Sequence, residues 1–126
     1  MSETPLKQVG PSAKHGAGTW KAERWTSLLL VPLALWGLWS VGDIAGAGYE
    51  GAVAWLRQPV NAALLLVTLA ISAWHAVLGL HVIIEDYLHG GFGVFLLRLT
   101  TLMGWLLFAV AAGAVAVVFF GLGFGV

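Results

Sequence analysis

Apolar residues along this chain form three long runs, separated by short polar segments. The runs cover residues 25–45, 59–86 and 95–121, and we predict a helix over each of them. A helix rises about 1.5 Å per residue, so about 20 apolar residues cross the hydrocarbon core of a bilayer. Every run reaches that length. The pattern therefore predicts an all-α fold, an integral membrane three-helix transmembrane bundle.

The polar positions divide the chain into a polar N-terminal tail at residues 1–22 and a single transmembrane domain at residues 23–126. The tail is rich in Gly, Ser and Lys, and it lacks the apolar stretch of a secretory signal peptide. The two connections, at residues 42–57 and 85–93, are too short to hold a further domain. Near the end of the third run, Ala109 with Gly113 and Ala112 with Ala116 place small residues four apart, a spacing that favours close helix packing in lipid.

The composition supports a bilayer as the solvent of this chain. Hydrophobic residues make up 60% of the 126 residues and charged residues 10%, whereas soluble domains carry about 25% charged residues. The formal net charge is zero, so nothing indicates the basic patch of a nucleic-acid-binding protein. The chain has no cysteine, which excludes Cys-ligated zinc and Cys-held iron–sulfur clusters within it.

The positive charges predict how the bundle lies in the membrane. Only Arg57 stands in the connection between the first and second runs; the other positive residues lie on the side shared by the N-terminus and the second connection, and they are Lys7, Lys14, Lys21, Arg24 and Arg98. Short segments rich in Lys and Arg stay on the cytoplasmic side. We therefore expect the N-terminus inside and the C-terminus outside.

Ionisable residues at membrane depth are costly and indicate function. His75 stands 11 residues before Asp86, about 16 Å along a helix and so near the middle of the membrane. At about 100° per residue, His75, Gly79, Val82 and Asp86 fall on one stripe. Gly79 leaves room for a flat ligand beside the imidazole, which can ligate haem iron. A hydrogen-bonded polar group is the alternative reading of His75.

Other polar residues also allow two interpretations. His81 is rotated by about 240° from His75, so the two cannot ligate one metal from the same helix, and His81 could instead bond a backbone carbonyl or a neighbouring helix. Asp86 and Tyr87 could hydrogen-bond an amphipathic quinone, or simply end the helix and anchor it at the interface. Arg24 could pair with a carboxylate of a cofactor, or serve only as an inside charge.

The segment from His75 to Tyr87 resembles the hydrophobic membrane anchor subunit of succinate dehydrogenase, respiratory complex II, of the D type. That family has a histidine, a glycine four residues later, and an Asp-Tyr pair at positions 11 and 12 after the histidine. This chain has all four, at His75, Gly79, Asp86 and Tyr87. The segment from Arg24 to Ser27 is similar to the family's Arg-x-Thr/Ser entry into the first helix. The resemblance in helix layout covers nearly the whole chain.

The resemblance implies roles for these residues. His75 would be one axial ligand of the iron of a b-type haem, next to Gly79, with the other ligand supplied by a second anchor subunit of the C type. Arg24 would approach a haem propionate. Tyr87 would hydrogen-bond the ubiquinone headgroup, with Asp86 beside it. The spacing of His15 from Arg24 does not match the N-terminal histidine of the family, so His15 receives no role.

The resemblance also implies an assembly. The chain would anchor the flavoprotein and iron–sulfur subunits of succinate:ubiquinone oxidoreductase in the membrane lipid, and would not be catalytic alone. Such a complex serves the tricarboxylic acid cycle and the respiratory chain. The absence of an Arg- and Ser-rich presequence favours a bacterial cell inner membrane over a mitochondrial one. The alternatives are a haem-free structural anchor and a small oligomeric transporter; the middle of each run lacks the carboxylate that coupled transport usually needs.

Overall fold

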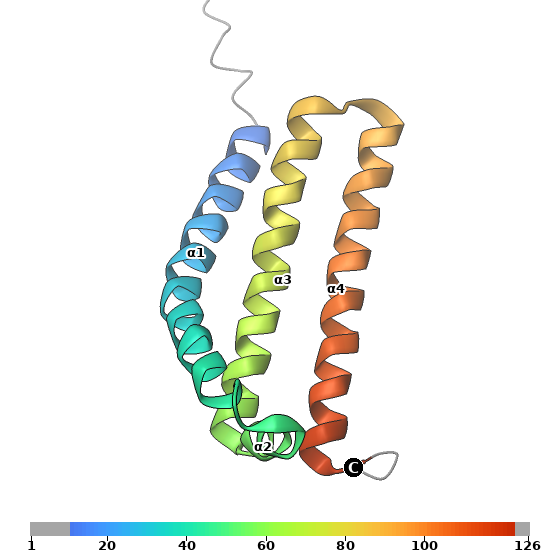
Figure 1. Cartoon of the computed structure of the whole chain (residues 1–126). Coiled ribbons are helices and arrows are strands. Elements are labelled where there is room, and N and C mark those ends of the chain that lie inside the picture. Colours follow the sequence, from blue (N-terminus) through green and yellow to red (C-terminus); the bar gives the residue numbers. More distant parts are fainter. Residues whose placement is uncertain (1–10, 123–126) are drawn as a thin grey trace, which may run out of the picture.

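The computed structural model describes residues 11–122, with side chains from residue 18 onward, and this part of the chain is all-helical. Its elements are α1 (Pro11–Ile44), α2 (Gly48–Leu56), α3 (Pro59–Tyr87) and α4 (Gly90–Phe120), as Figure 1 shows. Three segments are long and apolar enough to cross a membrane: Gly18–Ile44, Pro59–Tyr87 and Gly90–Phe120. The predicted three-helix membrane bundle is confirmed.

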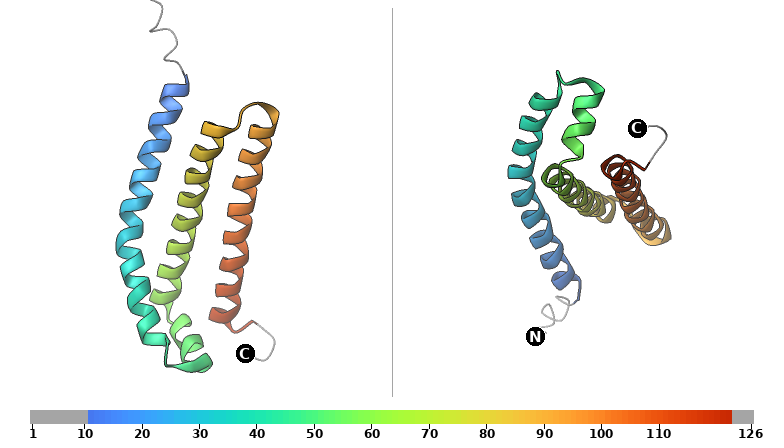
Figure 2. Two further views of the ribbon diagram at one scale, coloured as in Figure 1. Left: turned by 45° about the horizontal axis from the view of Figure 1, so that its top comes forward. Right: turned by 90° about the horizontal axis from the view of Figure 1, so that it is seen from below.

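The three long helices lie side by side, with α3 between α1 and α4 (Figures 1 and 2). Among the described residues, α3 packs against both neighbours, whereas α1 and α4 do not touch. The beginning of α1 and the turn between α3 and α4 share one end of the bundle, and α2 lies across the other end. Each long helix therefore has surface that no other helix of this chain covers in the described part.

Local chemistry fixes the helix ends. Pro59 occupies the first turn of α3, where its missing N–H would have had no helical partner. Gly90 opens α4 with a φ of +79°, and Gly121 ends it with a φ of +65°, a left-handed conformation that costs glycine little. Arg57, just after α2, donates from Nε to the carbonyl oxygen of Val118 at 3.0 Å, which places a cation at the negative end of α4.

The helices differ from the predicted ranges at three places. α1 begins at Pro11 and α4 at Gly90, earlier than the predicted starts at residues 25 and 95. The apolar pattern marks only the part of a helix that suits lipid, whereas the helical backbone hydrogen bonds continue through polar residues. The connection predicted at residues 42–57 contains α2, whose Trp55 ring stacks on Trp36 of α1 at 5.8 Å. The predicted end of a polar tail at residue 22 falls inside α1, while residues 1–10 lie outside the described part.

Burial is sparse for a chain so apolar. Among the described residues the buried hydrophobic side chains are Ala62, Val77 and Val115, and Thr26 and Ser40 are the buried polar ones. Large apolar side chains such as Leu38 (71%) and Trp39 (75%) are mostly exposed. An exposed apolar surface of this extent marks contact with lipid or with other membrane subunits.

At Gly104, α4 packs tightly against Val77 of α3. A Cβ added there would overlap Cγ2 of Val77, so only glycine lets the two helices approach this far. Of the two predicted small pairs, Ala109 and Gly113 are exposed, and a Cβ at Gly113 would meet nothing within 4 Å, whereas Ala112 and Ala116 are half-buried. The Ala109–Gly113 pair therefore makes no close contact within the described part of this chain.

Candidate functional site

A hydrogen bond inside the bundle joins His75 of α3 to Thr26 of α1. The Nδ1 atom of His75 lies 2.8 Å from the hydroxyl oxygen of Thr26. Thr26 is only 2% exposed, although most of its neighbours on α1 face outward. His75 itself is half-buried. The contact links residues 49 positions apart, and it holds one nitrogen of the imidazole while leaving Nε2 for another partner.

The side of α3 next to His75 is open at Gly79. Gly79 follows one helical turn later, and a Cβ added to it would meet nothing within 4 Å. The described residues contain no cluster of three or more His, Asp or Glu side chains able to hold a metal ion.

Arg24 lies on the surface of α1, away from the contact with His75. Its guanidinium carbon is 5.2 Å from the centroid of the Trp20 ring, a cation–π distance. Arg24 precedes Thr26 by two residues, which turns it by about 200° around the helix. A shallow groove of about 380 Å³ runs along this surface, and its lining residues are Trp20, Glu23, Arg24, Ser27 and Leu28. Arg24 is therefore available to an anionic group on the outer surface of α1, about 3 Å along the helix axis from Thr26.

Asp86 and Tyr87 are the last two residues of α3. Both are exposed, and Tyr87 retains 80% of its accessible surface. The 11 residues from His75 to Asp86 correspond to about 16 Å along the helix axis. The structure thus brings Thr26 to His75, and leaves the Asp86–Tyr87 pair as a separate site at the end of the bundle.

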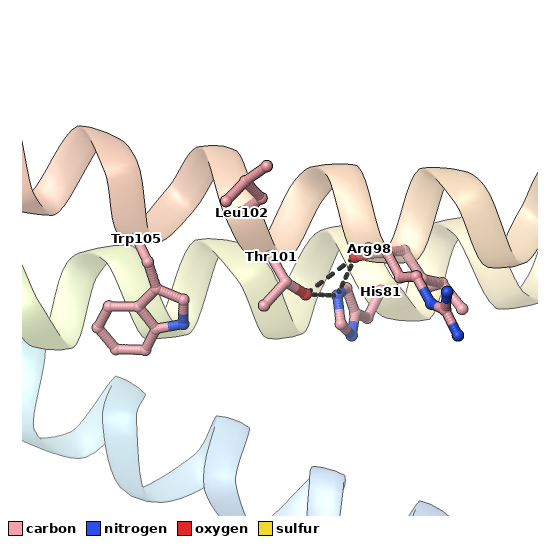
Figure 3. A pocket seen from close by; sticks show the side chains of 6 residues that line it. His81, Arg98, Thr101, Leu102 and Trp105 are labelled. Carbon is pink, nitrogen blue, oxygen red and sulfur yellow. Dashed lines mark hydrogen bonds between the residues drawn. The ribbon is translucent and has the colours of Figure 1, made fainter.

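His81 is held by α4. Its Nε2 atom lies 2.8 Å from Thr101 Oγ1 and 3.2 Å from the carbonyl oxygen of Leu97, and Thr101 Oγ1 is also 2.9 Å from that carbonyl (Figure 3). This confirms the expectation that His81 bonds a neighbouring helix. Beside it is a shallow groove of about 470 Å³, whose lining residues are His81, Leu97, Arg98, Thr101, Leu102 and Trp105.

The sequence did not single out the two threonines that bind the histidines. Thr26 and Thr101 each stand in an apolar run, where a hydroxyl ordinarily bonds the backbone carbonyl one turn earlier and carries no further meaning. A signal was present only for Thr26, which belongs to the segment that resembles the family's entry into the first helix.

Comparison with known proteins supports the family that the sequence resembles. A sequence profile of the family described as Succinate dehydrogenase/Fumarate reductase transmembrane subunit matches residues 4–120. The succinate dehydrogenase hydrophobic membrane anchor subunits of Rickettsia conorii and Rickettsia bellii are each 35% identical, over 78 and 77 residues, which is 61% of this chain and 62% of each relative. The succinate dehydrogenase membrane anchor subunit of Reclinomonas americana is 32% identical over 80 residues, 61% of this chain and 67% of that protein.

These matches span less than two thirds of the length of the Rickettsia relatives. No solved structure matches the chain. The family profile, in contrast, covers most of the sequence from the polar start to the end of α4, and the three long apolar helices fit a membrane subunit. The chain belongs to the family of succinate dehydrogenase/fumarate reductase transmembrane subunits.

Proposed function

We propose that this chain is the hydrophobic membrane anchor subunit of a succinate:ubiquinone oxidoreductase. It would bind the iron–sulfur and flavoprotein subunits at the membrane and pair with a second anchor subunit of the C type. Two features support the need for partners: the chain has no cysteine to hold a cluster, and most of its apolar surface is exposed. The complex, and not this chain alone, would oxidise succinate and pass the electrons to ubiquinone.

The proposal includes a b-type haem shared with the second anchor. His75 would give one axial nitrogen to the iron, and Gly79 would leave the space beside it for the macrocycle. Haem, when bound, exchanges single electrons. The observation that carries this assignment is the orientation of the His75 ring: Nδ1 is occupied by Thr26 at 2.8 Å, and the open flank at Gly79 adjoins it. Arg24 would neutralise a propionate at the surface of α1.

The quinone would bind near Tyr87 and Asp86. Tyr87 presents an exposed phenol at the end of α3, where a membrane helix meets water, and a phenol O–H can donate to a quinone carbonyl oxygen. Reduction of a quinone to a quinol takes two electrons and two protons. The exposed carboxylate of Asp86 can exchange protons with the aqueous side, so the pair combines a donor for the headgroup with a proton relay.

The proposed membrane is a bacterial cell inner membrane, with the N-terminus inside and the C-terminus outside. In the structure Lys21 and Arg24 lie in the N-terminal half of α1 and Arg98 lies in the N-terminal third of α4, whereas Arg57 lies just after α2. The start of α1 and the start of α4 share one end of the bundle (Figure 1). This grouping supports the orientation, because Lys and Arg concentrate on the cytoplasmic side.

Co-purification tests the proposal. An affinity tag on this chain should retain three further subunits, one with flavin and one with iron–sulfur clusters, and the complex should show the absorption bands of a b-type haem. His75→Ala should abolish or shift these bands. His81→Ala is the matched control and should leave them unchanged, because His81 is bound by α4. A complete complex without haem would support a haem-free structural anchor, and purification as a homo-oligomer alone would support a transporter.

A further inference from the structure

We propose that Thr26 is a positioning residue: it fixes the tautomer and the orientation of the His75 ring so that Nε2 is presented to the haem iron. This inference rests on the haem ligation proposed above. Thr26 does not touch the iron or the reacting quinone. It acts through the imidazole, from a neighbouring helix.

The direction of the hydrogen bond follows from the contacts of one oxygen. Thr26 Oγ1 lies 2.8 Å from the carbonyl oxygen of Ala22, 2.9 Å from that of Glu23, and 2.8 Å from Nδ1 of His75. A hydroxyl has one proton, and carbonyl oxygens only accept. If that proton pointed to Nδ1, the hydroxyl lone pairs would face two carbonyl oxygens at contact distance. The hydroxyl therefore donates to the α1 backbone and accepts a bond from Nδ1–H.

This assignment decides what the other ring nitrogen can do. A neutral imidazole carries its proton on one nitrogen only, so a protonated Nδ1 leaves a lone pair on Nε2. The bond also restrains rotation of the ring, because Thr26 is 2% exposed and a β-branched side chain in a helix has few rotamers. Partners of this kind orient metal-binding histidines and raise their basicity.

The second histidine of α3 shows the opposite arrangement. Thr101 Oγ1 lies 2.9 Å from the carbonyl oxygen of Leu97 and donates its proton to it, as Thr26 does to the α1 backbone. The histidine atom 2.8 Å from Thr101 Oγ1, however, is Nε2 of His81. That Nε2 also lies 3.2 Å from the Leu97 carbonyl oxygen, and must therefore carry a proton. A threonine–histidine hydrogen bond thus occupies Nε2 in His81, whereas in His75 it occupies Nδ1 and leaves Nε2 unbonded within this contact.

The test replaces Thr26 in the complete complex, purified through the flavoprotein subunit. Thr26→Val removes the acceptor and keeps the shape, and Thr26→Ser keeps the hydroxyl. Thr101→Val is the matched control, since it removes the equivalent bond to His81. The readouts are the ratio of haem to flavin, the spectrum of the oxidised haem and its midpoint potential. Succinate oxidation with a dye acceptor reports whether the soluble subunits remain assembled.

We expect Thr26→Val to lower haem affinity about 10-fold or more, by analogy with other partners of metal-binding histidines, and to move the midpoint potential upward. The upward shift is expected because a less basic imidazole stabilises ferric iron less. Thr26→Ser and Thr101→Val should keep the wild-type ratio, spectrum and potential. If the Thr26→Val complex does not assemble, Thr26→Ala replaces it, because alanine is smaller and cannot overlap its neighbours. The same readouts then test the inference.

An unchanged spectrum and potential in Thr26→Val would overturn the inference, as would an equal change in Thr101→Val or a loss in Thr26→Ser. The haem proposal fails in a different way: His75→Ala would then keep the haem bands of the wild type, or the wild type would have none. If His75→Ala loses haem while Thr26→Val matches the wild type, the ligand assignment stands and the positioning role does not.

Discussion

Replacing Gly104 by alanine tests the contact that holds α4 against α3. The new Cβ would overlap Cγ2 of Val77, and Val77 is 7% exposed. A valine in a helix has one strongly preferred χ1 rotamer, so its methyl group cannot swing aside and the helices must move apart. Overpacking of this kind costs about 1–3 kcal/mol.

A matched substitution isolates that cost. Gly113 lies on the same helix, and a Cβ there meets nothing within 4 Å, so Gly113→Ala gains only the helix propensity of alanine, about 0.5–1 kcal/mol. Gly104→Ala gains the same amount and adds the overlap. The difference in unfolding free energy between the two variants should therefore be about 1–3 kcal/mol.

The assay is unfolding in mixed micelles with a rising fraction of SDS, followed by tryptophan fluorescence, since Trp105 is next to Gly104 in the sequence. Val77→Ala removes the overlapping methyl group. The double variant Gly104→Ala with Val77→Ala should therefore be more stable than the sum of the two single effects by about the overlap cost, a coupling that contacting residues show. Equal stability of Gly104→Ala and Gly113→Ala, or strict additivity in the double variant, would refute the contact.

Two further predictions concern function and topology. Tyr87→Phe removes the phenol O–H and keeps the ring, so succinate–quinone turnover should fall by about 10-fold, the loss of roughly one hydrogen bond, while succinate oxidation with a dye acceptor is unchanged; a parallel fall of both activities would make Tyr87 only structural. Because the chain lacks cysteine, His89→Cys and Glu50→Cys provide single labelling sites: a membrane-impermeant thiol reagent should reach position 50 from the outside and position 89 only from the inside, and the reverse pattern would overturn the orientation.

The sequence predicted the spanning helices because lipid imposes a simple rule on them. A helix in hydrocarbon needs about 20 apolar residues, and that length is visible without any tertiary structure. The rule says nothing of helix that continues into water, so the first turns of α1 and α4 were missed. α2 was not predicted because its nine residues are too few to cross a membrane. Its position depends on tertiary contacts such as the stacking of Trp36 on Trp55.

In the candidate site, too, features within one helix could be predicted and contacts between helices could not. Helical phase separated His75 from His81, because both stand on one helix and rotation per residue is fixed. Phase could not identify Thr26 as the partner of His75, because that contact depends on how α1 packs against α3. Gly104 was missed for a similar reason: one glycine among several in α4 is distinguished only by the Val77 side chain that faces it.

The open bundle fits the proposal that a haem is shared with a second subunit. α3 contacts α1 on one side and α4 on the other, and α1 does not reach α4 within the described residues, so the faces beside His75 and Gly79 are not closed by a fourth helix of this chain. A bare imidazole nitrogen facing hydrocarbon would have no water to bind, and burying a polar group without a partner is costly. In the proposed complex, a second membrane subunit would bring a bound group to Nε2 and remove that cost. The Thr26 contact, made within this chain, would then prepare the ring before the partner arrives.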